Sequence, residues 1–90
     1  MKYFAYTYEL KARTGGVEKT ITLYTVKRNI LTQVVTISES YIDEFSLVMK
    51  TLETYKLLPK KAFERGPSGG FKYKQAWLLR DAGIANVQRI

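Results

Sequence analysis

The chain has 90 residues, the size of one small domain, and 46% of them are hydrophobic, so a folded core is expected rather than disorder. It contains no cysteine and no histidine, which excludes disulfides, thiolate or histidine zinc sites and histidine-based acid–base catalysis. Fifteen Lys and Arg residues against eight Asp and Glu residues give a formal net charge of +7, which favours a negatively charged partner.

Three segments in the first half have the composition of β-strands. Residues 3–11 alternate with a period of two, and residues 19–26 and 30–37 are rich in Thr, Ile and Val. The alternate residues of the first segment share one face: Phe4, Tyr6, Tyr8 and Leu10. The connections Thr14-Gly15-Gly16 and Lys27-Arg28-Asn29 are short enough for hairpins. The sequence therefore predicts a three-stranded antiparallel sheet.

An amphipathic helix is expected to begin at Ser38 or Ser40 and to end before Pro59. Ser40 followed by Asp43 has the spacing of a capping box. One face of this helix is apolar and consists of Tyr41, Ile42, Phe45, Val48, Met49, Leu52 and Tyr55. The opposite face is polar and consists of Glu39, Asp43, Ser46, Lys50 and Glu53. We expect the apolar face to cover one side of the sheet.

The last third of the chain is expected to be less regular. Residues 59–72, which include Pro67-Ser68-Gly69-Gly70, are predicted to be a flexible basic loop. Residues 73–90 are expected to complete a short helix within 71–82, stopped by Gly83, with a terminal strand at 84–90 as an option. In that helix Ala76, Trp77, Leu78 and Leu79 are expected to be partly buried.

The predicted fold class is therefore α+β, with a three-stranded antiparallel sheet packed by one amphipathic helix and followed by the short helix. We expect one domain over residues 1–90, in which residues 1–58 form the β-β-β-α unit.

The basic residues concentrate in residues 56–74, where Glu64 is the single acidic residue. Lysines there alternate with Phe71 and Tyr73, so an extended backbone would place aromatic rings on one side and charges on the other. Lysines neutralise phosphates, and aromatic rings stack on unpaired bases. The predicted nucleic-acid-binding residues are Lys27, Arg28, Lys56, Lys60, Lys61, Arg65, Lys72, Tyr73 and Lys74. The alternative is a solvated basic surface, with Phe71 and Tyr73 in the core.

A second candidate surface is the sheet face opposite the helix, with basic residues in its strands and turns. The residues considered for it are Tyr3, Lys11, Arg13, Lys19, Lys27 and Arg28. Nucleic-acid-binding modules of several kinds use an exposed sheet in this way. The alternative is that exposed Tyr and Thr simply favour strands.

Other chemistry finds little support. The glycines after Gly66 do not fit a phosphate-binding loop, since Phe71 stands where its second glycine is needed. Ser68 and Lys72 could pair as nucleophile and base, but they belong to a glycine-rich stretch without rigid support. The carboxylates of the amphipathic helix suit a solvated face better than a metal site. We expect no catalytic residue, no metal site and no cofactor.

The leading hypothesis is a small non-enzymatic protein that binds DNA or RNA, or acts as an accessory to a protein that does, by contacting phosphates. The alternative is a protein–protein interaction module or inhibitor, of the kind that phages or mobile elements encode, docking on an acidic partner. An exposed sheet edge could also support a homodimer. The sequence has no apolar run of ~18–20 residues and no signal peptide, so we expect a cytoplasmic protein without a membrane partner.

Overall fold

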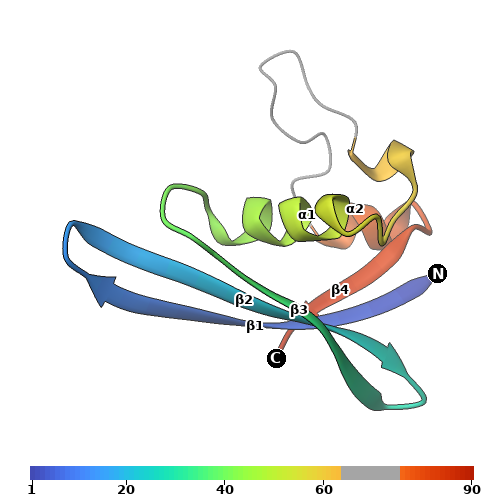
Figure 1. Ribbon diagram of the computed structural model, residues 1–90. Helices are drawn as coiled ribbons and strands as arrows, with labels where there is room; N and C mark the ends of the chain where they lie inside the picture. Colours follow the sequence, from blue (N-terminus) through green and yellow to red (C-terminus); the bar gives the residue numbers. More distant parts are fainter. Residues whose placement is uncertain (64–75) are drawn as a thin grey trace.

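The computed structural model describes the backbone of residues 1–63 and 76–90 and the side chains of residues 1–63 and 79–90. A twisted sheet carries the helices on one of its faces, in an α+β arrangement (Figure 1). The elements follow in the order β1 (Lys2–Arg13), β2 (Gly16–Lys27), β3 (Ile30–Glu39), α1 (Glu44–Thr54), the 3-10 helix η1 (Lys60–Phe63), α2 (Ala76–Asp81) and β4 (Ala85–Arg89).

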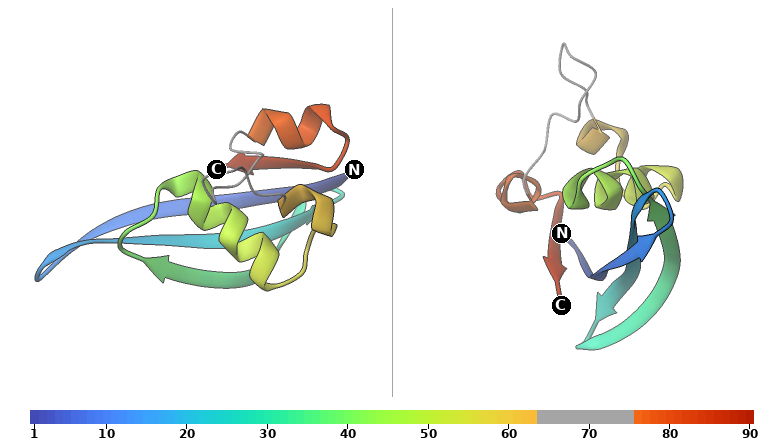
Figure 2. Two further views of the ribbon diagram at one scale, coloured as in Figure 1. Left: turned by 90° about the horizontal axis from the view of Figure 1, so that it is seen from above. Right: turned by 90° about the vertical axis from the view of Figure 1, so that its left-hand side faces the viewer.

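The sheet has four strands in the order β3-β2-β1-β4. Strand β1 pairs antiparallel with β2, β2 pairs antiparallel with β3, and β4 pairs parallel with β1. Figure 2 shows β3 and β4 at the two edges. The predicted three-stranded antiparallel sheet is therefore wrong. After β3 the chain crosses the helical face before it returns beside β1, and such a crossover allows parallel pairing, which a hairpin does not.

The two hairpins turn through residues with left-handed backbone angles. Gly15 has a φ of 88°, which glycine adopts without steric cost. In the second hairpin Arg28 has a φ of 51° and Asn29 a φ of 63°. A tight hairpin turn whose twist matches its strands needs positive φ at both central positions. The second turn therefore places an arginine where glycine or asparagine is favoured.

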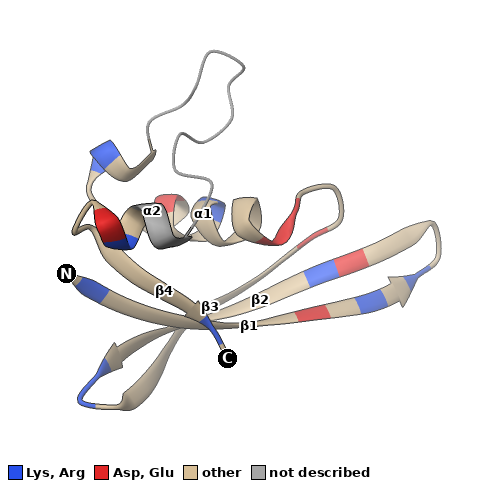
Figure 3. Cartoon of the chain, turned by 180° about the vertical axis from the view of Figure 1, so that it is seen from behind, with Lys and Arg blue, Asp and Glu red and all other residues tan. Residues whose placement is uncertain are grey.

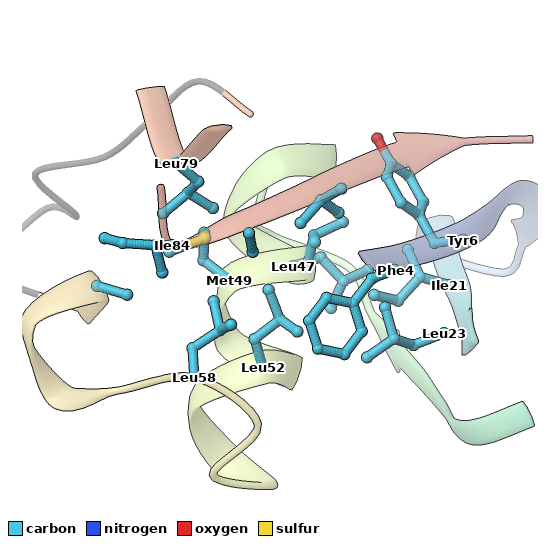
Figure 4. Close-up of a cluster of buried hydrophobic side chains, with 14 residues drawn as sticks. Phe4, Tyr6, Ile21, Leu23, Leu47, Met49, Leu52, Leu58, Leu79 and Ile84 are labelled. Atoms are coloured by element: carbon cyan, nitrogen blue, oxygen red, sulfur yellow. The ribbon is translucent and has the colours of Figure 1, made fainter. Parts of the chain in front are cut away.

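The core lies between the sheet and α1 (Figure 4). Phe4 and Tyr6 are buried on the predicted face of β1, whereas Leu10 is exposed because its part of the hairpin extends past the helices. The fully buried side chains of α1 are Leu47, Val48, Met49, Thr51 and Leu52.

Helix α1 begins later than predicted. Asp43 is its N-cap and accepts hydrogen bonds from the backbone N of Ser46 at 2.8 Å and from Ser46 Oγ at 3.1 Å. The bond from the Ser46 backbone holds the pKa of Asp43 below its usual value. The predicted capping box of Ser40 and Asp43 is wrong, since Asp43 itself caps the helix. Tyr41 thus precedes the helix and is 93% exposed, not part of its buried face.

Glu44, the first residue of α1, joins the helix to two strands. Tyr6 Oη donates to Glu44 Oε2 at 2.6 Å, and Arg89 Nη1 donates to Glu44 Oε1 at 3.0 Å. The Arg89 guanidinium also lies 5.2 Å from the centre of the Tyr8 ring. Burial, and then the hydrogen bond to Glu44, raise the pKa of Tyr6. This network fixes β4 and β1 under the start of α1.

The segment predicted as a flexible loop begins with regular structure. Lys60–Phe63 form the 3-10 helix η1, in which the Ala62 N–H donates to the Pro59 carbonyl at 3.0 Å. Ala62 is buried in the core, and this burial holds the turn in place. Residues 64–72 of the predicted loop lie outside the described residues.

Helix α2 ends as the sequence predicts. Gly83 has a φ of 71° and donates from its N–H to the Arg80 carbonyl at 3.0 Å, and the Ile84 N–H donates to the Leu79 carbonyl at 2.9 Å. These two bonds satisfy the last carbonyls of the helix. Leu79 is fully buried, while the side chains of residues 76–78, also predicted to be partly buried, lie outside the described part of the chain.

Candidate nucleic-acid interface

Five of the nine predicted binding residues lie in the described part of the chain. Lys27 and Arg28 lie at the β2–β3 turn, Lys56 follows α1, and Lys60 and Lys61 begin η1. The other four lie outside the described residues: Arg65, Lys72, Tyr73 and Lys74.

Figure 3 shows the start of β1, the β2–β3 turn and η1, each with basic residues, on the same side of the molecule. Lys27 and Lys2 line the same hollow, which Leu57 also lines. Lys2 Nζ donates to the Leu57 carbonyl at 3.0 Å, next to Lys56. Lys56 and Lys60 line a second hollow. We call this surface the basic end, and define it as Lys2, Lys27, Arg28, Lys56, Lys60 and Lys61.

Two cations of the basic end occupy backbone positions that favour glycine. Arg28 has a left-handed φ in the β2–β3 turn, and Lys56 has a φ of 53° just after α1. The Lys56 N–H donates to the Glu53 carbonyl at 3.1 Å, and the Leu57 N–H donates to the Leu52 carbonyl at 2.9 Å. This pair of bonds is a Schellman motif, whose left-handed residue is usually glycine. The left-handed conformation therefore costs about 1–2 kcal/mol at each of these two residues.

Four cations outside the basic end are paired with carboxylates. Arg13 pairs with Glu18 at 2.6 Å, and Lys50 pairs with Glu39. Arg89 pairs with Glu44 at 3.0 Å and Arg80 with Asp81 at 3.6 Å. Within residues 1–63 and 79–90, the six cations of the basic end form no ion pair, although Glu53 lines the same hollow as Lys56 and Lys60. The positive charge of the basic end is thus not neutralised by a carboxylate within these residues.

The sheet forks at the basic end. The β1–β2 ladder ends at the pair Phe4–Thr25. Beyond it, Lys2 and Tyr3 continue to pair with β4, whereas Val26 and Lys27 continue to pair with β3. Figure 1 shows the start of β1 and the β2–β3 turn diverging from this point.

A hollow of about 340 Å³ opens where the strands separate. Its lining is mainly apolar and consists of Met1, Lys2, Tyr3, Phe4, Thr25, Val26, Lys27 and Leu57. We call it the fork hollow. Its volume lies in the range of about 300–1,000 Å³ that small-molecule sites occupy.

The second surface considered from the sequence, the open face of the sheet, is largely uncharged. Thr20 and Ser38 are hydrogen-bonded across it at 2.7 Å, and Thr22 and Thr36 at 3.1 Å. Lys19 lies on the helical side instead, where its Nζ donates to the Ile42 carbonyl at 3.0 Å.

The remaining residues considered for this face do not form one basic patch. Lys11 is opposite Glu18 in the β1–β2 ladder, and Arg13 is paired with Glu18, so these charges are partly neutralised. The basic residues named for this face therefore divide between the β1–β2 hairpin, the helical side and the basic end.

The acidic residues of the helix have structural partners. Glu39 pairs with Lys50, Asp43 caps α1, and Glu44 binds Tyr6 and Arg89. In the described residues no group of three or more carboxylates is placed to hold a metal ion. No helix in the described ranges is long and apolar enough to cross a membrane.

No protein-family model, curated protein or solved structure matches this chain at a significant level. The functional interpretation therefore depends on the geometry of the chain itself.

Lys2 and the fork hollow were missed from the sequence. Lys2 has no basic neighbour in the sequence, and the hollow exists because two ladders diverge. Tyr3, considered only for the open sheet face, also lines the fork hollow and is 53% exposed.

Proposed function

We propose that this protein binds DNA or RNA through the basic end and does so without catalysing a reaction. The observation that carries the proposal is a set of cations from three separate parts of the chain, none of which is ion-paired within residues 1–63 and 79–90. They come from the start of β1, the β2–β3 turn and the segment from Lys56 to Lys61, where Lys2 and Lys27 line one hollow and Lys56 and Lys60 line another. Three independent segments with the same sign of charge indicate a surface made for a polyanion.

The geometry suits contacts to a phosphate backbone. Lysine ammonium groups are compact charges on flexible stems and can follow phosphates without a fixed approach angle. Arg28 adds a planar guanidinium at the tip of a hairpin, where it can reach a phosphate or a base edge. Such contacts set affinity and salt dependence more than sequence preference.

The proposal is tested by fluorescence anisotropy with labelled DNA and RNA at low and high salt. Reversing Lys27, Arg28, Lys60 and Lys61 to Glu should abolish binding, because four phosphate contacts become repulsions. The matched control reverses Lys11 and Arg13, which lie on the β1–β2 hairpin away from the basic end, and should bind nearly as well as the parent. If the parent binds no nucleic acid at low salt, the proposal is wrong.

The same charges would attract an acidic protein, and the test separates the two partners. A pull-down in which one protein partner survives nuclease treatment, combined with no binding to pure nucleic acid, would favour the interaction module. Retention of the partner only while nucleic acid is intact would favour the proposed function.

A second copy of the chain is an additional candidate partner, through the free edge of β3. This strand lies at the edge of the sheet and has no charged residue between Ile30 and Ser38. Ile30, Leu31 and Val34 are exposed along it. Lysine and proline, which often protect such an edge, are absent from Ile30 to Ser38, and the register shift opposite Leu23 and Tyr24 interrupts the edge only locally. Light scattering over a range of concentrations tests this homodimer.

A further inference from the structure

We propose that the fork hollow accepts an unpaired base, so that the basic end prefers single-stranded over double-stranded nucleic acid. This inference rests on the proposed function and adds the form of nucleic acid that the site takes. It follows from the composition of the hollow, whose mainly apolar lining also contains two cations, Lys2 and Lys27.

The lining of the fork hollow suits the flat face of a base. Tyr3 contributes an exposed aromatic ring, whereas the ring of Phe4 is buried in the core, and Val26 and Leu57 contribute aliphatic surface. Tyr3 is half-exposed, so its ring can be covered by a ligand without unfolding the strand. Base–aromatic stacking is tolerant of sequence because every base has a π-face.

The rim of the fork hollow suits the phosphates on either side of that base. Lys2 and Lys27 line the hollow from its two strands, and Arg28 follows Lys27 in the turn. A small apolar ligand would gain nothing from these charges, whereas a nucleotide places its base and its phosphates on the two kinds of surface at once. Charge complementarity therefore selects a nucleotide as the occupant.

A base inside a duplex cannot enter the hollow, since both of its faces are stacked on neighbours. An unpaired base enters without the cost of opening a base pair. Both forms should make the phosphate contacts. Only a single strand should gain the additional affinity from a base bound in the fork hollow.

The experiment compares three probes that all have a phosphate backbone. They differ in whether bases are present and whether those bases are paired. They are a short labelled oligothymidylate, an abasic strand of the same length, and a duplex of the same length. Anisotropy should show the oligothymidylate binding more tightly than the abasic strand. Tyr3→Ala should weaken oligothymidylate binding by about 5- to 150-fold, the range for loss of one stacked base, and leave the abasic strand unaffected.

Two further variants and one control sharpen the result. Tyr3→Phe keeps the ring and should bind like the parent, and Val26→Trp should fill the hollow and lower single-strand affinity without a change of charge. Tyr41→Ala removes an almost fully exposed tyrosine that does not line the fork hollow and should have no effect. Circular dichroism confirms that each variant is folded.

The outcomes separate the two proposals. Equal affinity for the base-bearing and abasic strands, unchanged by Tyr3→Ala, would overturn the role of the fork hollow while the phosphate-binding function stands. Absence of binding to all three probes at low salt would overturn both. A preference for oligothymidylate that disappears in Tyr3→Ala and Val26→Trp would support the inference.

Discussion

Replacing the two strained cations by glycine should stabilise the protein and weaken its binding at the same time. Arg28 and Lys56 both have left-handed backbone angles and both belong to the basic end. For a residue with a side chain this conformation costs about 1–2 kcal/mol. Glycine removes that cost but brings an unfolded-state entropy penalty of about 0.5–1 kcal/mol. Each glycine should therefore add about 0.5–1 kcal/mol to the free energy of unfolding.

The stability change is large enough to measure. Together, Arg28→Gly and Lys56→Gly should add about 1–2 kcal/mol, which corresponds to a rise in Tm of roughly 5–15 °C for a domain of this size. Thermal unfolding followed by circular dichroism, and urea unfolding at constant m-value, would measure it. A loss of stability in the double variant would refute the backbone argument.

The binding change follows from counterion release. Six phosphate contacts to single strands give a slope of log affinity against log salt of about −4, since each contact contributes about −0.7. Between 50 and 200 mM salt, affinity should then fall by roughly 300-fold. With two contacts removed the slope becomes about −3 and the fall roughly 50-fold. A stabilised double variant that keeps the parental slope would show that Arg28 and Lys56 do not contact phosphates.

Two controls separate backbone strain from charge. Arg28→Gln with Lys56→Gln removes the charges but keeps side chains in the strained positions, so binding should weaken without a gain in stability. Asn29→Gly changes the neighbouring left-handed residue without a change of charge, so it should leave the salt slope unaltered. Asparagine tolerates the left-handed conformation, so Asn29→Gly should stabilise the protein less than Arg28→Gly or Lys56→Gly.

Three other predictions concern the fold and its edge. Tyr6→Phe removes the hydrogen bond to Glu44 and should cost about 1–2 kcal/mol in urea unfolding. The pKa of Tyr6 is raised in the folded state, so the stability that its hydroxyl contributes is present below the ordinary tyrosine pKa of about 10 and is lost as the pH rises above it. Tyr6→Phe has no such hydroxyl and should therefore lose less stability in alkali than the parent. Asp43→Ala should cost about 1 kcal/mol as a lost helix cap, whereas Asp43→Asn should retain the cap. The pKa of Asp43 is lowered, so the parent should lose this contribution below about pH 4 and Asp43→Asn should not. Val34→Lys places a charge on the free edge of β3 and should abolish any concentration-dependent dimer in light scattering, and a dimer that survives it would exclude this edge.

Local patterns were enough to predict the first three strands and the main helix. Alternation in residues 3–11 placed Phe4 and Tyr6 correctly in the core, and the stop at Gly83 was also correct. The apolar residues have helical spacing from Tyr41 onward, but Tyr41 precedes the helix. The helix begins after Asp43, whose side chain caps it. Periodicity thus identified the element and misplaced its start by several residues.

The fourth strand could not be placed by such patterns. Residues 85–89 are short, and their partner in β1 lies more than eighty positions earlier in the chain. Parallel pairing over that separation depends on how the helices cover the sheet, which no local signal encodes. The strand order, and with it the fork between β1 and β2, could therefore not be predicted from the sequence.

The candidate site divides in the same way. Charge density identified Lys56, Lys60 and Lys61, and turn composition drew attention to Lys27 and Arg28. Their convergence with Lys2 depends on the ladders that bring the start of β1 to the end of β2. Composition could thus suggest candidate residues, while their arrangement on the surface depends on the register of the strands.

The distribution of ion pairs leaves the excess positive charge of the described residues at the basic end. Four cations outside it each have a carboxylate partner: Arg13, Lys50, Arg80 and Arg89. Exposed pairs of this kind add little to stability, but they cancel the field of the charges they contain. The excess positive charge of the described residues is thus concentrated at the open end of the sheet. There the strands have separated, an apolar hollow is exposed, and Arg28 and Lys56 keep their charges at a conformational cost. Solubility alone does not require charge at strained backbone positions, so the proposed contact with a polyanion predicts that glycine at Arg28 and Lys56 lowers affinity while it raises stability.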